Sequence, residues 1–240
     1  MRAQITAPVR RLVDVLSGVG PPVDDPVRVA ADVTAAGCSV ALEHTPAAGA
    51  TDPAAELRAL VARVADAGLA GACELTVPVD RLGAAAAGPA RAATDAGLGV
   101  ALDGASAAVD ALAAEVGPVT VVVRAAAPGA EERCRALADA HVRLTGGRGA
   151  AADLAFVRCL NVLMSGAGRL GVGTTDPRLV AIAGERAAWN ERAPDSWEYV
   201  MPWQVRSEQQ RRLVAGGYRV RVVLRSGPAT ATLRRPAGRS

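Results

Sequence analysis

The segment WEYVMPWQVRSEQQRRLVAGGYRVRVVLR, residues 197–225, decides the fold of this 240-residue chain. It opens with an apolar run at 197–201 and closes with another at 218–224, and both are rich in residues that favour strands. The polar segment between them has helical spacing and ends in Gly216-Gly217, where glycine commonly stops a helix. The stretch therefore predicts a strand, a crossover helix and a second, parallel strand.

The same rhythm runs through the rest of the chain. Segments with helical spacing, such as PAAELRALVARVADAG (53–68) and GAEERCRALADA (129–140), separate successive β-rich runs. Six such runs precede the opening segment, at residues 38–43, 73–79, 99–103, 119–124, 141–145 and 170–174. Eight strands alternating with seven helices predict an α/β fold, a closed (β/α)8 TIM-type barrel of parallel strands.

An open Rossmann-like sheet is the main alternative, and it requires a Gly-x-Gly-x-x-Gly turn between an early strand and a helix. The first predicted strand instead ends in Glu43-His44-Thr45-Pro46. The glycine-rich segment GAGRLGVG (166–173) leads into a strand rather than a helix. Both observations favour the barrel.

We expect one barrel domain over residues 24–240, preceded by a lead-in over residues 1–23. A helix is predicted over 24–37, because an aspartate followed by Pro26 is a helix start signal. After the last strand only SGPATATLRRPAGRS (226–240) remains, and its prolines leave no room for a full helix. The last outer helix is therefore expected to be short or missing, which would leave one side of the barrel for another protein or a second copy of the chain.

The composition excludes several classes of site. All 27 basic residues are arginine, so no phosphate-loop lysine or Schiff-base lysine exists, and a net charge of +3 with 2% aromatic residues argues against nucleic-acid binding. Four separated cysteines and two histidines indicate reduced, buried thiols and no metal site. No signal peptide or membrane-spanning run is seen, so we expect a cytoplasmic protein and leave peripheral membrane contact open.

Polar side chains cluster where the predicted strands end, which is where barrels of this kind carry their active sites. These positions are Glu43-His44, Asp80, Asp103, Arg124, Arg143 to Arg148, Thr174 to Asp176, Glu198 to Trp203, and Arg225 onward. The pattern predicts a site at the carboxyl ends of the strands.

From Gly37 onward, the order of these segments resembles the FAD-dependent proline dehydrogenase family. GVALDG (99–104) resembles its third strand, and HVRLTGGRG (141–149) matches its Arg-Leu-Val-Lys-Gly-Ala-Tyr strand at positions 143, 144 and 147. VGTTDPRL (172–179) is similar to its Ala-Thr-His-Asp strand, and EYVMPWQ (198–204) stands where it has Glu-Phe-Gln-Met-Leu-Tyr-Gly. QRRLVAGGYRVRV (210–222) is close to identical with a common form of that segment.

This resemblance implies FAD-dependent oxidation of L-proline, or a similar cyclic amino acid, to 1-pyrroline-5-carboxylate at the barrel mouth. It implies that Asp103 and Arg143 are catalytic and that Arg234 and Arg235 bind the substrate carboxylate. The implied FAD contacts are Gly104, Arg124, Gly146, Gly147, Arg148, Thr174 and Thr175. The expected partners are the small-molecule substrate, an electron acceptor such as a quinone, and a second copy in a homo-oligomer.

The chain also departs from the family pattern. Pro78 stands at the family's lysine, Arg124 at a glutamine, Thr175 at a histidine and Val223 at the tyrosine of the substrate pocket. At Gly146 the Lys-Gly-Ala-Tyr turn becomes Gly-Gly-Arg-Gly. We hypothesise that Arg124 replaces the lost electrostatic support.

Two alternatives for the function and three for single residues remain open at the level of sequence. The chain could be a non-catalytic barrel that has lost FAD and acts as an interaction or regulatory protein, or an enzyme of another chemistry with Asp103 and Glu198 as acid and base. Asp103 could merely cap the helix that follows it. Arg143 could form a structural ion pair with Asp103 or Glu198, and Arg234-Arg235 could be a solvated tail.

Overall fold

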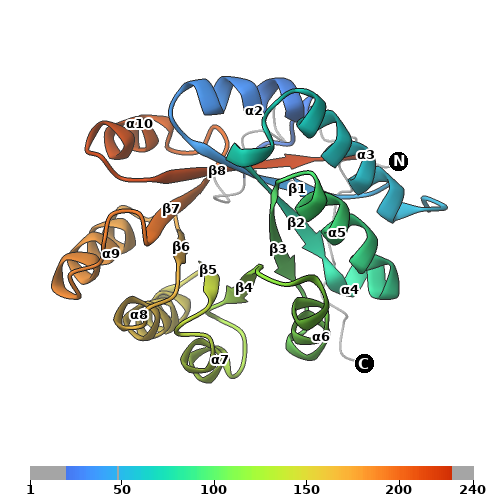
Figure 1. Ribbon diagram of the computed structural model, residues 1–240. Helices are drawn as coiled ribbons and strands as arrows, with labels where there is room; N and C mark the ends of the chain where they lie inside the picture. The colour runs from blue at the N-terminus through green and yellow to red at the C-terminus, as the bar shows by residue number, and fades with distance from the viewer. Residues whose placement is uncertain (1–19, 48, 229–240) are drawn as a thin grey trace, which may run out of the picture.

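The computed structural model describes residues 20–47 and 49–228. Eight strands pair side by side in chain order, all parallel, and β1 closes the barrel against β8 (Figure 1). The strands are β1 Ser39–His44, β2 Cys73–Pro78, β3 Gly99–Asp103, β4 Thr120–Arg124, β5 His141–Thr145, β6 Leu170–Gly173, β7 Trp197–Pro202 and β8 Val220–Ser226. The predicted (β/α)8 barrel is confirmed.

The helices form an outer ring around the strands (Figure 1). They are α2 Pro26–Ala35, α3 Pro53–Asp66, α4 Val79–Leu82, α5 Ala87–Asp95, α6 Ser106–Val116, α7 Ala130–Ala136, α8 Ala150–Ser165, α9 Pro177–Trp189 and α10 Ser207–Ala215, with 3-10 turns at Ala70–Ala72 and Gly83–Ala86.

Three helices begin with the same local signal, an aspartate followed by proline. Asp25, Asp52 and Asp176 are the N-caps of α2, α3 and α9, and each carboxylate accepts a hydrogen bond from a main-chain N–H of the first turn. The proline occupies a position whose N–H has no partner within the helix. These helix starts are therefore set by residues adjacent in sequence.

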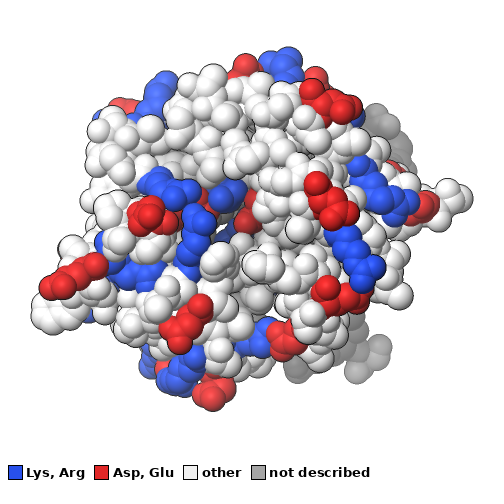
Figure 2. Space-filling model, in the orientation of Figure 1, with Lys and Arg blue, Asp and Glu red and all other residues white. Residues whose placement is uncertain are grey.

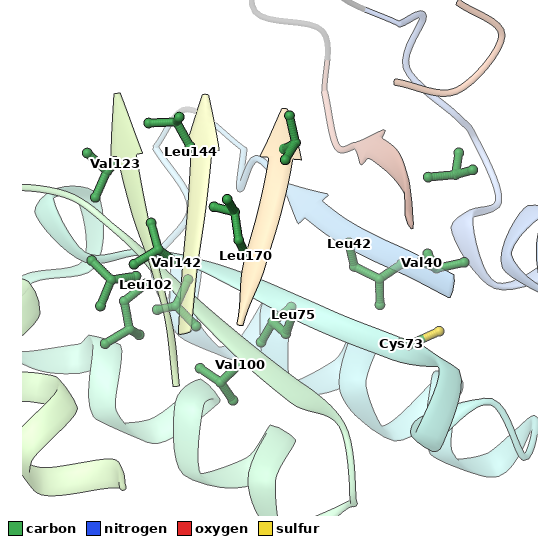
Figure 3. Packing of buried hydrophobic residues seen from close by; sticks show 14 of the residues in the cluster. Val40, Leu42, Cys73, Leu75, Val100, Leu102, Val123, Val142, Leu144 and Leu170 are labelled. Carbon is green, nitrogen blue, oxygen red and sulfur yellow. The ribbon is translucent and has the colours of Figure 1, made fainter. Parts of the chain in front are cut away.

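The hydrophobic core lies between the strands and the helices, because alternate strand residues point outward. Val40 and Leu42 of β1 are buried on the outer side of the barrel, facing the helices, and so are Val142 and Leu144 of β5. Figure 3 shows these residues with others of the same cluster on neighbouring strands. The other alternate residues of these strands, such as Glu43 and Arg143, therefore face the inside of the barrel.

Helix α2 covers the side of the barrel that was expected to be open. It contacts both β1 and β8 and buries Val29 and Val33, and Figure 1 shows it lying over these two strands. Helix α2 thus covers the outside of the barrel where β1 meets β8. The prediction of a short or missing last helix concerns residues that the structure does not describe. Residues 229–240, which include Arg234 and Arg235, lie outside the described residues.

The structure also bears on the expectations about surface charge, cysteines, metal-binding groups and membrane-spanning segments. The face shown in Figure 2 carries arginine and acidic side chains interspersed, without one continuous basic surface. All four cysteines are free; Cys73, Cys134 and Cys159 are buried as expected, whereas Cys38 is only half-buried. Within residues 20–47 and 49–228, no group of metal-binding side chains comes together, and no helix is both long and apolar enough to cross a membrane.

Candidate active site

A cavity of about 990 Å³ opens at the carboxyl ends of the strands. Every strand except β2 contributes to its wall or its rim. Eight of the residues predicted from sequence line it: Asp103, Arg124, Arg143, Gly146, Gly147, Arg148, Thr174 and Thr175. The barrel thus brings most of the predicted site into one cavity, large enough for a cofactor together with a small substrate.

Gly104 does not line this cavity. It lies beside Asp80, and a Cβ at this glycine would be 2.9 Å from the Asp80 Oδ1 atom. The Asp80 carboxylate accepts hydrogen bonds of 2.9 and 3.1 Å from the main-chain N–H of Ala105, the residue before α6. Asp80 therefore secures the start of α6, and the interpretation of Asp103 as its cap is wrong.

Arg143 lies in the interior of the barrel, with a side chain only 3% exposed. Its guanidinium forms an ion pair with Glu74 on β2, donates a hydrogen bond of 3.1 Å to the Thr76 hydroxyl, and lies 3.8 Å from the Glu43 carboxylate. Burial lowers the pKa of Arg143 to about 10, so the group stays charged at neutral pH.

Arg143 therefore pairs with Glu74. The alternative taken from the sequence, an ion pair with Asp103 or Glu198, is wrong. Glu74 and Thr76 occupy alternate, inward positions on β2, and Thr120 on β4 donates a hydrogen bond of 2.9 Å to Glu74. Sequence reasoning missed Glu74 because it stands in a β-rich run. The signal was available: a carboxylate at an inward position of a barrel strand needs a cation.

Asp103 ends β3 at the cavity wall, next to Arg124 at the end of β4. The Arg124 guanidinium donates a hydrogen bond of 2.6 Å to Asp103 Oδ2, while Asp103 Oδ1 is buried and has no hydrogen-bond partner among the described residues. Burial raises the pKa of Asp103, and the neighbouring Arg124 partly opposes this effect. Asp103 thus lines the cavity and carries a buried acceptor atom whose hydrogen-bonding capacity is unused in the described structure.

Glu198 lies elsewhere. As the second residue of β7 it pairs with Arg221 at 2.6 Å and accepts a hydrogen bond of 3.3 Å from the Ser39 hydroxyl, near the amino ends of the strands. It does not line the mouth cavity. Asp103 and Glu198 therefore cannot act together as acid and base on one substrate.

The rim between β5 and α9 is polar and rich in arginine. Arg178 bridges Asp176 at 2.8 Å and Asp153 at 3.4 Å, and its hydrogen bonds to Asp176 lower the pKa of that carboxyl to about 2. The main-chain N–H of Asp176 donates to the Thr174 hydroxyl at 3.2 Å, which fixes the loop after β6. Five arginines line the cavity in total, Arg124, Arg143, Arg148, Arg178 and Arg225. Four acidic residues line it as well, Glu43, Asp103, Asp153 and Asp176, so positive and negative side chains are nearly balanced in this cavity.

Neither a protein-family model nor a curated protein sequence matches the chain. The fold is similar to that of solved proline utilization A (PutA) proteins. The structure from Bdellovibrio bacteriovorus, inactivated by N-propargylglycine, aligns with a TM-score of 0.69 and 14% identity over 84% of this chain and 29% of that chain. A variant from Bradyrhizobium japonicum aligns with a TM-score of 0.61 and 13% identity over 79% of this chain and 26% of that chain.

A further structure, described as a bifunctional proline utilization A protein, gives a TM-score of 0.61 at 14% identity. The chain spans less than a third of the length of these proteins. At such identities the likeness concerns the barrel fold. It agrees with the proline dehydrogenase-like fold expected from the sequence.

Proposed function

We propose that this chain is a flavin-dependent oxidoreductase of the proline dehydrogenase type, oxidising L-proline or a similar cyclic amino acid. The observation that carries the proposal is the single cavity at the barrel mouth, which gathers Asp103, Arg143 and the glycine-rich loop 146–149. These are the segments in which the sequence resembles the family. The fold shared with proline utilization A proteins supports the same assignment.

The residues of the cavity fit FAD, a dianionic dinucleotide. The loop 146–149 leads directly into α8, and the N-terminus of a helix of 16 residues favours phosphate. Gly149 has φ +87° and open space around its Cβ position, so the backbone can approach a ligand there. Arg148 and Arg178 line the same wall, where Arg178 is also paired with Asp153 and Asp176.

The proposed reaction removes a hydride from C5 of the proline ring and a proton from its nitrogen, leaving a C=N double bond. FAD, when bound, supplies the acceptor for the hydride. Arg143, held by Glu74 and Thr76, provides a fixed cation at the floor of the cavity and stabilises negative charge that develops above it.

We assign the proton to Asp103. Asp103 lines the cavity, its Oδ1 atom has no hydrogen-bond partner in the described structure, and burial raises the pKa of the carboxyl above its ordinary value, which makes the carboxylate a stronger base. Arg124 holds the other carboxylate oxygen and so orients the group. Arg124 would thus have two roles: it positions Asp103, and, as hypothesised from the sequence, it supplies electrostatic support to the flavin.

Two measurements test the function. The purified chain should show the visible absorbance of a flavin, either as isolated or after incubation with FAD, and L-proline should bleach it and reduce a dye acceptor. Asp103→Asn should retain the flavin and lose turnover by about 100-fold or more, the usual contribution of a general base. A colourless protein that takes up no FAD would contradict the proposal.

The second candidate is a barrel that has kept the scaffold without the flavin and serves as an interaction or regulatory protein. The observation that favours it is the ion pair between Arg143 and Glu74, which neutralises the Arg143 charge without any ligand. Pro78, which pairs with Asp103 at the end of β2, also offers no charge to the mouth. Under this alternative, added FAD leaves the unfolding temperature unchanged, whereas a binder is stabilised by mass action.

A further inference from the structure

Among the residues that the structure describes, one arginine of the mouth forms no ion pair or hydrogen bond through its side chain. Arg225 is exposed at the end of β8 and lines the cavity, and within the described part of the chain its guanidinium makes no hydrogen bond or ion pair. Arg124 and Arg178, by contrast, are each paired with an aspartate. Arg225 is therefore the mouth guanidinium whose forked donors are available for a ligand carboxylate.

Glu43 lies directly beside Arg225. The two residues are register partners on the adjacent strands β1 and β8, which lie about 4.8 Å apart in parallel sheets. Both side chains face the cavity, and no direct ion pair joins them in the described structure. The site thus holds a carboxylate and a guanidinium side by side, with their charged groups apart.

The Glu43 side chain is 37% exposed, and this exposed part faces the mouth cavity. Burial within the barrel raises the pKa of Glu43, while Arg143 and Arg225 lower it in part. A cation bound in the cavity would offset the cost of keeping this carboxylate charged. Glu43 is therefore suited to receive an ammonium group.

An apolar wall adjoins this charged pair. Val223 precedes Arg225 by two residues on the same inward face of β8, and Pro202 on β7 pairs with Val223. Val200 continues the wall on β7. A compact aliphatic ring could lie on this surface while its charged groups reach Glu43 and Arg225.

We propose that Glu43 and Arg225 form a subsite for a zwitterionic amino acid, in which Arg225 binds the carboxylate and Glu43 binds the ammonium group. The inference rests on the proposed function and specifies how the substrate is recognised. It assigns the carboxylate to Arg225 rather than to Arg234 and Arg235, the pair suggested by the family resemblance.

The experiment measures binding by calorimetry, with three probes and the full chain, with and without added FAD. The probes are L-proline, pyrrolidine, which lacks the carboxylate, and cyclopentanecarboxylate, which lacks the amine. Arg225→Gln should weaken proline and cyclopentanecarboxylate by roughly 10- to 100-fold, the range for a hydrogen bond to a charged group, and leave pyrrolidine unchanged. Glu43→Gln should weaken proline and pyrrolidine and leave cyclopentanecarboxylate unchanged.

The matched control is Arg211→Gln, which removes an exposed arginine on α10 outside the cavity and should change none of the three affinities. Arg225→Lys keeps the charge without the fork and should give an intermediate loss for proline. Because each variant keeps full affinity for one probe, that retained affinity shows that the variant is folded.

Several outcomes would overturn the inference. One is an Arg225→Gln variant that binds all three probes as the wild type does, together with a loss of proline binding in Arg234→Gln or Arg235→Gln. Another is a Glu43→Gln variant that binds pyrrolidine as the wild type does. A third is a wild-type chain that binds none of the twenty common amino acids, even when it carries flavin. Binding of a different amino acid with the same dependence on both residues would uphold the inference and contradict only the assignment of proline.

Discussion

Replacing Glu74 with leucine should destabilise the barrel more than removing any ion pair on its surface, because it leaves the Arg143 charge buried. Arg143 is 3% exposed and Glu74 is 8% exposed, so neither charge is hydrated by bulk water. Breaking a buried pair by removing one partner typically costs about 3–5 kcal/mol. The Thr76 hydroxyl at 3.1 Å and the Glu43 carboxylate at 3.8 Å remain near Arg143, so we expect a cost towards the lower end.

The assay is a double-mutant cycle measured by denaturant and thermal unfolding. A loss of about 3 kcal/mol corresponds to a fall of roughly 6–12 °C in the unfolding midpoint for a domain of this size. Glu74→Leu and Arg143→Met should each show a loss of this order. The double variant should lie within about 1–2 kcal/mol of the wild type, since both charges are then gone.

The control is the exposed pair Glu208 and Arg212 on α10, whose side chains are 70% and 77% exposed. Replacing either with alanine should cost less than about 0.5 kcal/mol. If Glu74→Leu costs no more than this control, or if the two interior substitutions are simply additive, the interior ion pair does not hold the barrel as argued.

Three further substitutions test local features. Asp176→Ala should lower the free energy of unfolding by about 1 kcal/mol, because it removes the N-cap of α9. The pKa of Asp176 in the folded protein is lowered to about 2, so this stabilisation should be complete at neutral pH and should disappear as the pH falls from about 4 towards 2. Measuring the unfolding midpoint of both proteins across this pH range tests the prediction. Gly173→Ala should cost about 1–3 kcal/mol, since its Cβ would lie 2.8 Å from a main-chain oxygen of β5, whereas Gly71→Ala, with open space around it, should be close to neutral in the same unfolding assay. Tyr199→Phe should lose about 1 kcal/mol, because its buried hydroxyl donates a hydrogen bond of 3.0 Å to the Val180 carbonyl; equal stability of the two proteins would contradict that contact's role.

The element order could be predicted because its signals are local. Apolar runs of strand length and the Asp-Pro starts of α2, α3 and α9 are each read from a few neighbouring residues. The predicted strand at 119–124 became β4 at Thr120–Arg124, and that at 218–224 became β8 at Val220–Ser226. The differences lie at strand ends, where hydrogen bonding to the neighbouring strand decides the boundary.

The charge pairs could not be predicted in the same way. Glu74 and Arg143 are 69 residues apart, and two strands separate β2 from β5 in the ring. The sequence offered Asp103 and Glu198 as equally reasonable partners for Arg143. The stagger of the strands in the closed barrel decides which inward residues share a layer, and no local pattern encodes that stagger.

By itself, the sequence determined that this chain forms a closed barrel of parallel strands and that its polar residues gather at the carboxyl ends, because both properties follow from alternation and strand direction. Only the tertiary structure decided that Arg143 pairs with Glu74. It also decided that, among residues 20–47 and 49–228, Asp103 Oδ1 has no hydrogen-bond partner and Arg225 stands beside Glu43 without an ion pair. These depend on register across the ring, which brings distant residues into contact and fixes which charges are already neutralised and which are left for a ligand.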